Sequence, residues 1–120
     1  PFKKVGALAH FMLPSERPLD PKSPVKYIGG GFEHFISVFS RSGGIPMRSQ
    51  FKVVGGAATL TVSGGLEIGR RNAEAIAEAF ARARLRVSAT ETGGSLGRTV
   101  QLHVKTGRLL VWSVSSSHEL

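Results

Sequence analysis

The chain has 120 residues, of which 41% are hydrophobic and 20% charged, as is typical of one soluble globular domain. It contains no cysteine, which excludes disulfides, thiolate metal ligands and a cysteine nucleophile within these residues. No apolar run approaches the roughly 18 to 20 residues that span a bilayer, and no leader peptide is recognisable. The first residue is Pro1 rather than methionine, so we expect that further sequence has been lost from this end.

The formal net charge of +8 arises from 16 Lys and Arg against 8 Asp and Glu. Such an excess favours acidic partners by electrostatic steering and raises the question of nucleic acid. However, the basic residues are scattered along the chain and no aromatic-and-basic RNA-recognition motif accompanies them. The pattern therefore favours a solvated basic surface over nucleic-acid binding, which stays open only as a third hypothesis.

The first third of the chain predicts a strand, a loop and a helix. Residues 5–13 alternate loosely in polarity, which indicates a strand leaving a hairpin that began before Pro1. Four prolines between residues 14 and 27 indicate an exposed loop, because proline disrupts both helices and strand ladders. Apolar residues then recur at helical spacing up to Ser42-Gly43-Gly44; they are Phe32, Phe35, Ile36 and Phe39.

The middle of the chain predicts a strand followed by the clearest helix. Residues 51–54 form the strand, which continues at residues 59–62 beyond a glycine kink. At that kink, Gly55 and Gly56 mark a point where the backbone turns left-handed or passes close to another element. The helix runs from about residue 70 to 84, and its predicted packed side comprises Ala73, Ile76, Ala77, Phe80 and Ala83.

The last third predicts mainly strands. Residues 85–89 alternate as a strand, and a glycine-rich loop at residues 90–97 follows. Residues 99–104 and 109–114 form a hairpin, and residues 115–120 are a frayed tail. On the second hairpin strand the predicted shared face comprises Leu110, Trp112 and Val114. The order of elements indicates a single α/β domain.

Common catalytic motifs are absent, but one histidine stands out. The glycine-rich segments fit neither a phosphate-binding loop nor a dinucleotide fingerprint, and no nucleophile elbow is present. The histidines are too dispersed for a metal site; they are His10, His34, His103 and His118. His34 lies off the apolar stripe of its helix, which indicates a surface residue. His10 lies in an apolar run ended by Pro14 and suits proton transfer near neutral pH, but the spacing alone favours a core or turn histidine.

A series of short motifs, in order, resembles the chemoreceptor glutamine deamidase family, CheD, from about Gly6 to Val111. The motifs are Ala9-His10-Phe11-Met12-Leu13-Pro14, Lys26-Tyr27 before a helix, Val54-Gly55-Gly56-Ala57, Ile68-Gly69-Arg70-Arg71-Asn72, Glu91-Thr92-Gly93-Gly94 with Gly97-Arg98, and Thr106-Gly107. Each motif is weak alone, but six in register make chance an unsatisfactory explanation. The resemblance implies an α/β (α+β) layered sandwich of mixed β-sheets with helices on one outer face, as in the catalytic domain of cytotoxic necrotizing factor toxins.

The resemblance also implies an activity. CheD-like proteins hydrolyse selected glutamine side chains of methyl-accepting chemotaxis receptors to glutamate and ammonia, using a cysteine nucleophile, a histidine base and a supporting threonine, without cofactor or metal. His10 matches the catalytic histidine. The cysteine and the threonine lie upstream of it in the family and are not in this chain, so the chain as given is expected to be inactive. Residues 1–120 then represent a single CheD-like domain that lacks its N-terminal strand.

The remaining implications concern substrate and partners. Tyr27, Gly55 and Gly56 match positions expected to bind substrate, although a strand bend required by packing explains the glycines as well. Asn72 is expected to cap or brace its own helix. The implied partners are the chemoreceptors and the phosphatase CheC, in the cytoplasm, without membrane insertion or nucleic acid. The alternative is a non-catalytic chemotaxis adaptor that binds receptors or CheC.

Overall fold

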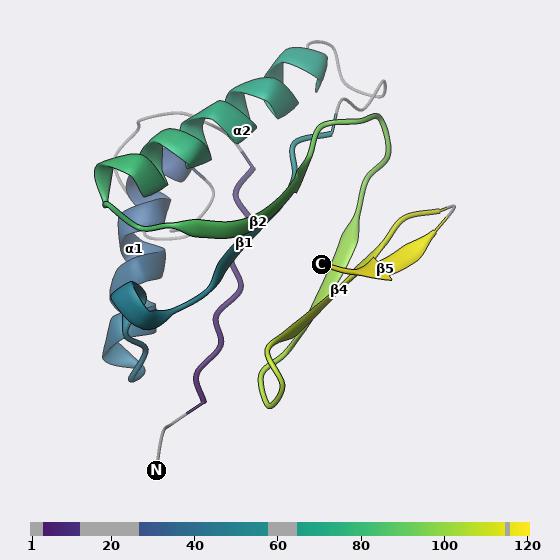
Figure 1. Cartoon of the computed structure of the whole chain (residues 1–120). Helices are drawn as coiled ribbons and strands as arrows, with labels where there is room; N and C mark the ends of the chain where they lie inside the picture. The colour runs from purple at the N-terminus through teal and green to yellow at the C-terminus, as the bar shows by residue number, and fades with distance from the viewer. Residues whose placement is uncertain (1–3, 13–26, 58–64, 115) are drawn as a thin grey trace.

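The computed structural model describes residues 4–12, 27–57, 65–114 and 116–120. In these ranges the chain forms, in order, α1 (Ile28–Arg41), a 3-10 turn η1 (Pro46–Arg48), β1 (Phe51–Gly55), α2 (Gly65–Arg82), β2 (Val87–Thr92), β3 (Thr99–His103), β4 (Arg108–Trp112) and β5 (Ser117–Glu119). Figure 1 shows α1 and α2 on one side of the β1–β2 pair and the other strands on the opposite side.

The strands form two small sheets of different kinds. β1 and β2 pair in parallel and are joined through α2, as a parallel pair requires a crossover connection. β3, β4 and β5 form an antiparallel sheet in chain order. Parallel and antiparallel sheets with helices on one outer face confirm the predicted α+β class.

The main core lies between the helices and β1. It comprises Ile28, Phe32, Phe51, Ile76, Ala79 and Phe80. The Phe80 ring lies edge-on to Phe32 at 4.9 Å and to Phe51 at 5.1 Å between centroids. Such contacts contribute beyond the burial of apolar area, so α2 is fixed against both α1 and β1.

The two predicted helices are confirmed, but the start and the packed side of the second helix differ from the prediction. α1 ends at Arg41 as predicted, and Gly43 follows with a φ of 104°. α2 begins at Gly65, not near residue 70, so the glycine at position 69 lies inside the helix. Its packed side is also different: Ala79 is buried, while Ala77 and Ala83 are exposed.

Three predictions on the strands were wrong. β2 extends to Thr92 because it pairs with β1 as far as Gly55. On β4 the buried residues are Leu109 and Val111, since these lie opposite Leu102 and Val100 of β3, whereas Val114 is 91% exposed. The predicted frayed tail contains β5, which pairs with β4.

The first strand prediction was also wrong, because residues 4–12 form no strand with the rest of the described chain. Their burial nevertheless alternates as the sequence predicts, with the odd positions 5 to 11 half-buried and the even positions exposed. The loop predicted at residues 14–26 and the strand predicted at residues 59–62 lie outside the described residues.

Candidate functional site

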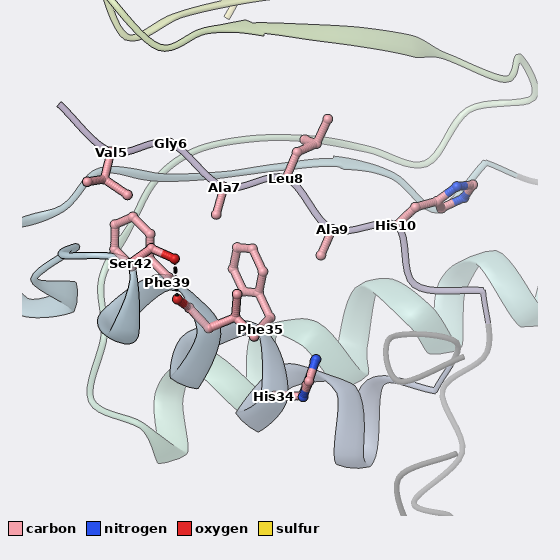
Figure 2. A pocket seen from close by; sticks show the side chains of 11 residues that line it. Val5, Gly6, Ala7, Leu8, Ala9, His10, His34, Phe35, Phe39 and Ser42 are labelled. Carbon is pink, nitrogen blue, oxygen red and sulfur yellow. Dashed lines mark hydrogen bonds between the residues drawn. The ribbon is translucent and has the colours of Figure 1, made fainter. Parts of the chain in front are cut away.

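His10 lies on the segment formed by residues 4–12, which runs beside α1. Figure 2 shows that Ala7 and Ala9 point toward α1, whereas Leu8 and His10 point away from it. Accordingly, His10 is exposed and Leu8 is 62% exposed. Within the described residues the His10 ring makes no hydrogen bond, so both ring nitrogens are open to a partner. The imidazole is therefore accessible, which excludes the alternative of a buried core histidine.

A groove of about 460 Å³ lies between this segment and α1 (Figure 2). Residues 5–10 form one wall, and the α1 side contributes His34, Phe35, Val38, Phe39 and Ser42. His34 is half-buried rather than fully on the surface, because it faces this groove. His34 thus faces the groove from α1, whereas His10 lies at the groove wall with its ring directed away from α1.

The opposite side of the segment faces the end of β3. A Cβ atom added to Gly6 would lie 2.9 Å from a methyl group of Val104 and 3.2 Å from one of Leu102. The Lys4 ammonium also donates a hydrogen bond to the carbonyl of Lys105, at 2.7 Å. The segment that carries His10 is therefore placed between α1 and the antiparallel sheet.

Asn72 of α2 contacts the segment just after His10. Its Nδ2 donates a hydrogen bond to the Met12 carbonyl at 3.1 Å. Its Oδ1 is buried and has no hydrogen-bond partner among the described residues. The expectation that Asn72 caps or braces its own helix was wrong, since this side chain braces a segment 60 residues away.

Gly55 and Gly56 form the left-handed turn that ends β1, with φ angles of 120° and 64°. A Cβ on Gly69 would lie 2.5 Å from the Gly56 carbonyl oxygen and 2.7 Å from that of Ala57. These distances confirm the predicted close backbone approach, and its partner is α2. Gly56 is thus explained by packing, whereas a Cβ on Gly55 would meet nothing within 4 Å, so Gly55 borders open space.

One face of α2 contacts both parts of the candidate site. Gly69, Asn72 and Ala73 are three and four residues apart, so they share a helix face. Gly69 and Ala73 lie against the Gly56 turn, and Asn72 holds Met12. The helix therefore brings the His10 segment and the Gly55–Gly56 turn onto one rigid element.

An ion cluster closes the other side of the glycine turn. The carbonyl of Gly55 accepts hydrogen bonds from the Gly93 amide at 2.9 Å and from Arg98 Nη1 at 3.3 Å. Arg98 Nε also pairs with Glu91 Oε2 at 2.9 Å, and the second Glu91 oxygen contacts the ring of His118 on β5. The two sheets are thus joined beside Gly55, and no local pattern in the sequence indicates this contact.

Tyr27 is the residue before α1, and its carbonyl accepts the first helical hydrogen bond, from the Gly31 amide at 2.8 Å. It lies seven residues before His34 and is not among the residues that line the groove. Roles of Tyr27, Gly55, Gly56 and His10 in binding or catalysis stay predictions at this point.

Two negative findings apply to the residues that the structure describes. No group of three or more His, Asp or Glu side chains is arranged to hold a metal ion there. None of the helices in those ranges is both long and apolar enough to cross a bilayer.

Comparison with known proteins gives a consistent result. Residues 12–113 match the family model described as CheD chemotactic sensory transduction. A probable chemoreceptor glutamine deamidase CheD of Symbiobacterium thermophilum is 37% identical over 126 aligned residues, covering all of this chain and 76% of that protein. The chemoreceptor glutamine deamidase CheD of Thermotoga maritima is 34% identical over 120, covering all of this chain and 75% of that protein. A probable chemoreceptor glutamine deamidase CheD of Methanococcus vannielii is 36% identical over 110, covering 91% and 71% respectively.

Proposed function

Because this chain belongs to the CheD family, we propose that the protein is a chemoreceptor glutamine deamidase, an amide hydrolase that converts receptor glutamine side chains to glutamate and ammonia. The observation that carries this proposal is the similarity over the whole chain to proteins named for that activity. The substrates are then methyl-accepting chemotaxis receptors, and the protein acts in the cytoplasm on their cytoplasmic helices.

In the proposed mechanism His10 is the general base. Its imidazole removes the proton of a cysteine thiol, and the thiolate attacks the amide carbon of the substrate glutamine. The imidazolium then protonates the departing ammonia, and water hydrolyses the resulting thioester. The exposure of His10 and its open ring nitrogens support this role. These 120 residues hold no cysteine, so the proposal assigns the thiol, and the threonine that supports His10, to sequence outside them.

We assign substrate binding to Gly55, Gly56 and Tyr27. The open space beside Gly55 supports this assignment, because a substrate chain can approach the backbone where no side chain projects. Gly56 contributes through the turn geometry, with its own left-handed φ of 64°. Tyr27 contributes from the N-terminal end of α1, the helix that lines the groove.

One alternative is a non-catalytic chemotaxis adaptor, which requires that sequence outside these 120 residues supplies no cysteine either. Such a protein would retain a surface that binds receptors or the phosphatase CheC and would have no hydrolase activity. The two functions differ in what they do to a bound receptor: the enzyme changes its mass, and the adaptor does not.

The test uses the full-length natural protein and a receptor cytoplasmic fragment. Mass spectrometry should detect conversion of specific glutamines to glutamates, and His10→Ala should abolish it. His103→Ala is the matched control, because His103 is an exposed histidine on β3 that the mechanism does not use. Conversion that survives His10→Ala would show that another group is the base. Receptor binding without any conversion would support the adaptor instead.

A further inference from the structure

The side chain of Asn72 makes one hydrogen bond and leaves a second polar atom without a partner. Nδ2 donates to the Met12 carbonyl, and the buried Oδ1 accepts no hydrogen bond from the part of the chain that the structure describes. The reverse orientation of the amide would place Oδ1 against the Met12 carbonyl oxygen, and two acceptors repel each other. The contact with Met12 therefore fixes which way the amide points.

This arrangement contributes little to stability. The net stabilisation from one hydrogen bond is no larger than the cost of burying one acceptor without a partner. The bond from Nδ2 is therefore offset by the unpaired Oδ1. The Met12 residue is 58% exposed, so its carbonyl can bind water when Asn72 is absent. Asparagine is also a weaker helix former than leucine in the interior of a helix such as α2. The energetics of folding alone do not explain an asparagine at position 72.

The His10 segment, in contrast, depends on this contact for its position. No backbone hydrogen bond joins residues 5–11 to the other described residues. Within those residues, the segment is held by hydrogen bonds only at its ends, from Lys4 to Lys105 and from Asn72 to Met12. Met12 is only two residues after His10 along the chain. The bond from Asn72 is therefore, of these two hydrogen bonds, the one nearer to His10 in the chain.

We propose that Asn72 is a positioning residue that fixes the His10 segment against α2 and thereby sets where the imidazole stands. The inference rests on the proposed function only for the role of His10. The hydrogen bond to the Met12 carbonyl makes no contact with substrate. It acts by limiting the motion of the chain that carries the base.

The first experiment uses NMR relaxation and thermal unfolding of the 120-residue chain. Asn72→Leu preserves the approximate shape and removes both polar atoms. Asn72→Asp keeps the size but replaces the donor with a carboxylate oxygen, which cannot donate to the Met12 carbonyl. We expect Asn72→Leu to unfold at the same temperature as the parent chain or a higher one. The backbone order parameters of residues 9–12 should fall in both variants, from near 0.85 toward about 0.6. Glu74→Gln is the control, because Glu74 is exposed on α2 and the substitution exchanges a carboxylate for an amide of the same size.

The second experiment measures receptor deamidation by the full-length natural protein with the same substitutions. Small displacements of a reacting group lower rates by up to about 100-fold, so we expect kcat to fall at least about tenfold with KM nearly unchanged. Glu74→Gln should leave both constants unchanged.

The outcomes separate the two proposals. If the unsubstituted full-length protein does not deamidate receptors, the proposed function fails, while the NMR result still decides whether Asn72 orders the segment. Order parameters that stay unchanged in both variants overturn the inference. It is equally overturned if Asn72→Leu unfolds the chain at a much lower temperature, since that result assigns a structural role, or if an active enzyme retains its kcat.

Discussion

Replacing Gly69 by alanine adds one methyl group where α2 meets the turn after β1. The new Cβ would lie 2.5 Å from the Gly56 carbonyl oxygen and 2.7 Å from that of Ala57. Both atoms belong to the backbone, and the adjoining Gly55 carbonyl is held by Gly93 and Arg98. The turn therefore cannot move away without disturbing β1 and its pairing with β2.

The expected loss of stability follows from two opposing effects. Overpacking costs about 1 to 3 kcal/mol, and two backbone contacts this short place the cost near about 3 kcal/mol. Alanine is a better helix former than glycine by about 1 kcal/mol, which offsets part of it. The free energy of unfolding should therefore fall by about 2 kcal/mol, a large fraction of the stability of a small domain.

Urea unfolding followed by circular dichroism measures this difference. Gly29→Ala is the matched control, because Gly29 is exposed in the first turn of α1. There the same substitution should raise the free energy of unfolding by about 0.5 to 1 kcal/mol. If Gly69→Ala is as stable as the parent chain or more so while Gly29→Ala behaves as expected, the close approach of α2 to the turn is refuted.

Three further predictions use matched pairs or conditions. Glu91→Gln should lower the free energy of unfolding by about 1 to 2 kcal/mol, because Arg98 is only 15% exposed and loses its ionic partner. Glu119→Gln should lower it by less than about 0.5 kcal/mol, because the pair of Glu119 with Arg108 is half exposed. Equal losses in urea unfolding would contradict the larger contribution assigned to the Glu91 pair. Val111 is 1% exposed, so Val111→Ala should lower the free energy of unfolding in urea by about 2 kcal/mol. Val114 is 91% exposed, so Val114→Ala should change it by less than about 0.5 kcal/mol. The reverse order would support the buried face predicted from the sequence. Association with an acidic receptor fragment, measured by calorimetry, should weaken as salt is raised because the chain carries a net charge of +8, and binding indifferent to salt would exclude steering.

Local periodicity was sufficient to predict the helices and most strands. The spacing of Phe32, Phe35 and Phe39 repeats every turn, and that repeat exists in the chain before any tertiary contact forms. The hairpin face was not predictable in this way, because residues 109 to 112 are all apolar and offer no alternation. Pairing with Val100 and Leu102 of β3 decides which of them are buried.

The C-terminal strand was missed for a related reason. Residues 115–119 are polar and resemble a tail, but β4 has a second edge that would be unpaired without them. Backbone groups on such an edge pair with any extended chain that reaches it, whatever its side chains. The formation of β5 therefore depends on the edge offered by β4, and the sequence of the tail itself gives little indication of a strand.

For the candidate site, residue type and motif order identified His10 and the glycine turn, but not what holds them. The sequence predicted the alternation along residues 5–11, and the structure places His10 on the face opposite Ala7 and Ala9. The bond from Asn72 to Met12 joins residues 60 positions apart. Contacts of that range leave no periodic signal, so only the folded structure could reveal them.

The face of α2 then explains why the motif at residues 68–72 accompanies the motifs around His10 and Gly55. Gly69 lets the helix approach the turn of Gly56 closely, and Asn72, three residues later, reaches the segment of His10. A helix is rigid over one turn, so the turn and the segment are positioned relative to the same body. A substitution on this face can displace both parts of the site together, whereas one on the exposed face at Glu74 can displace neither.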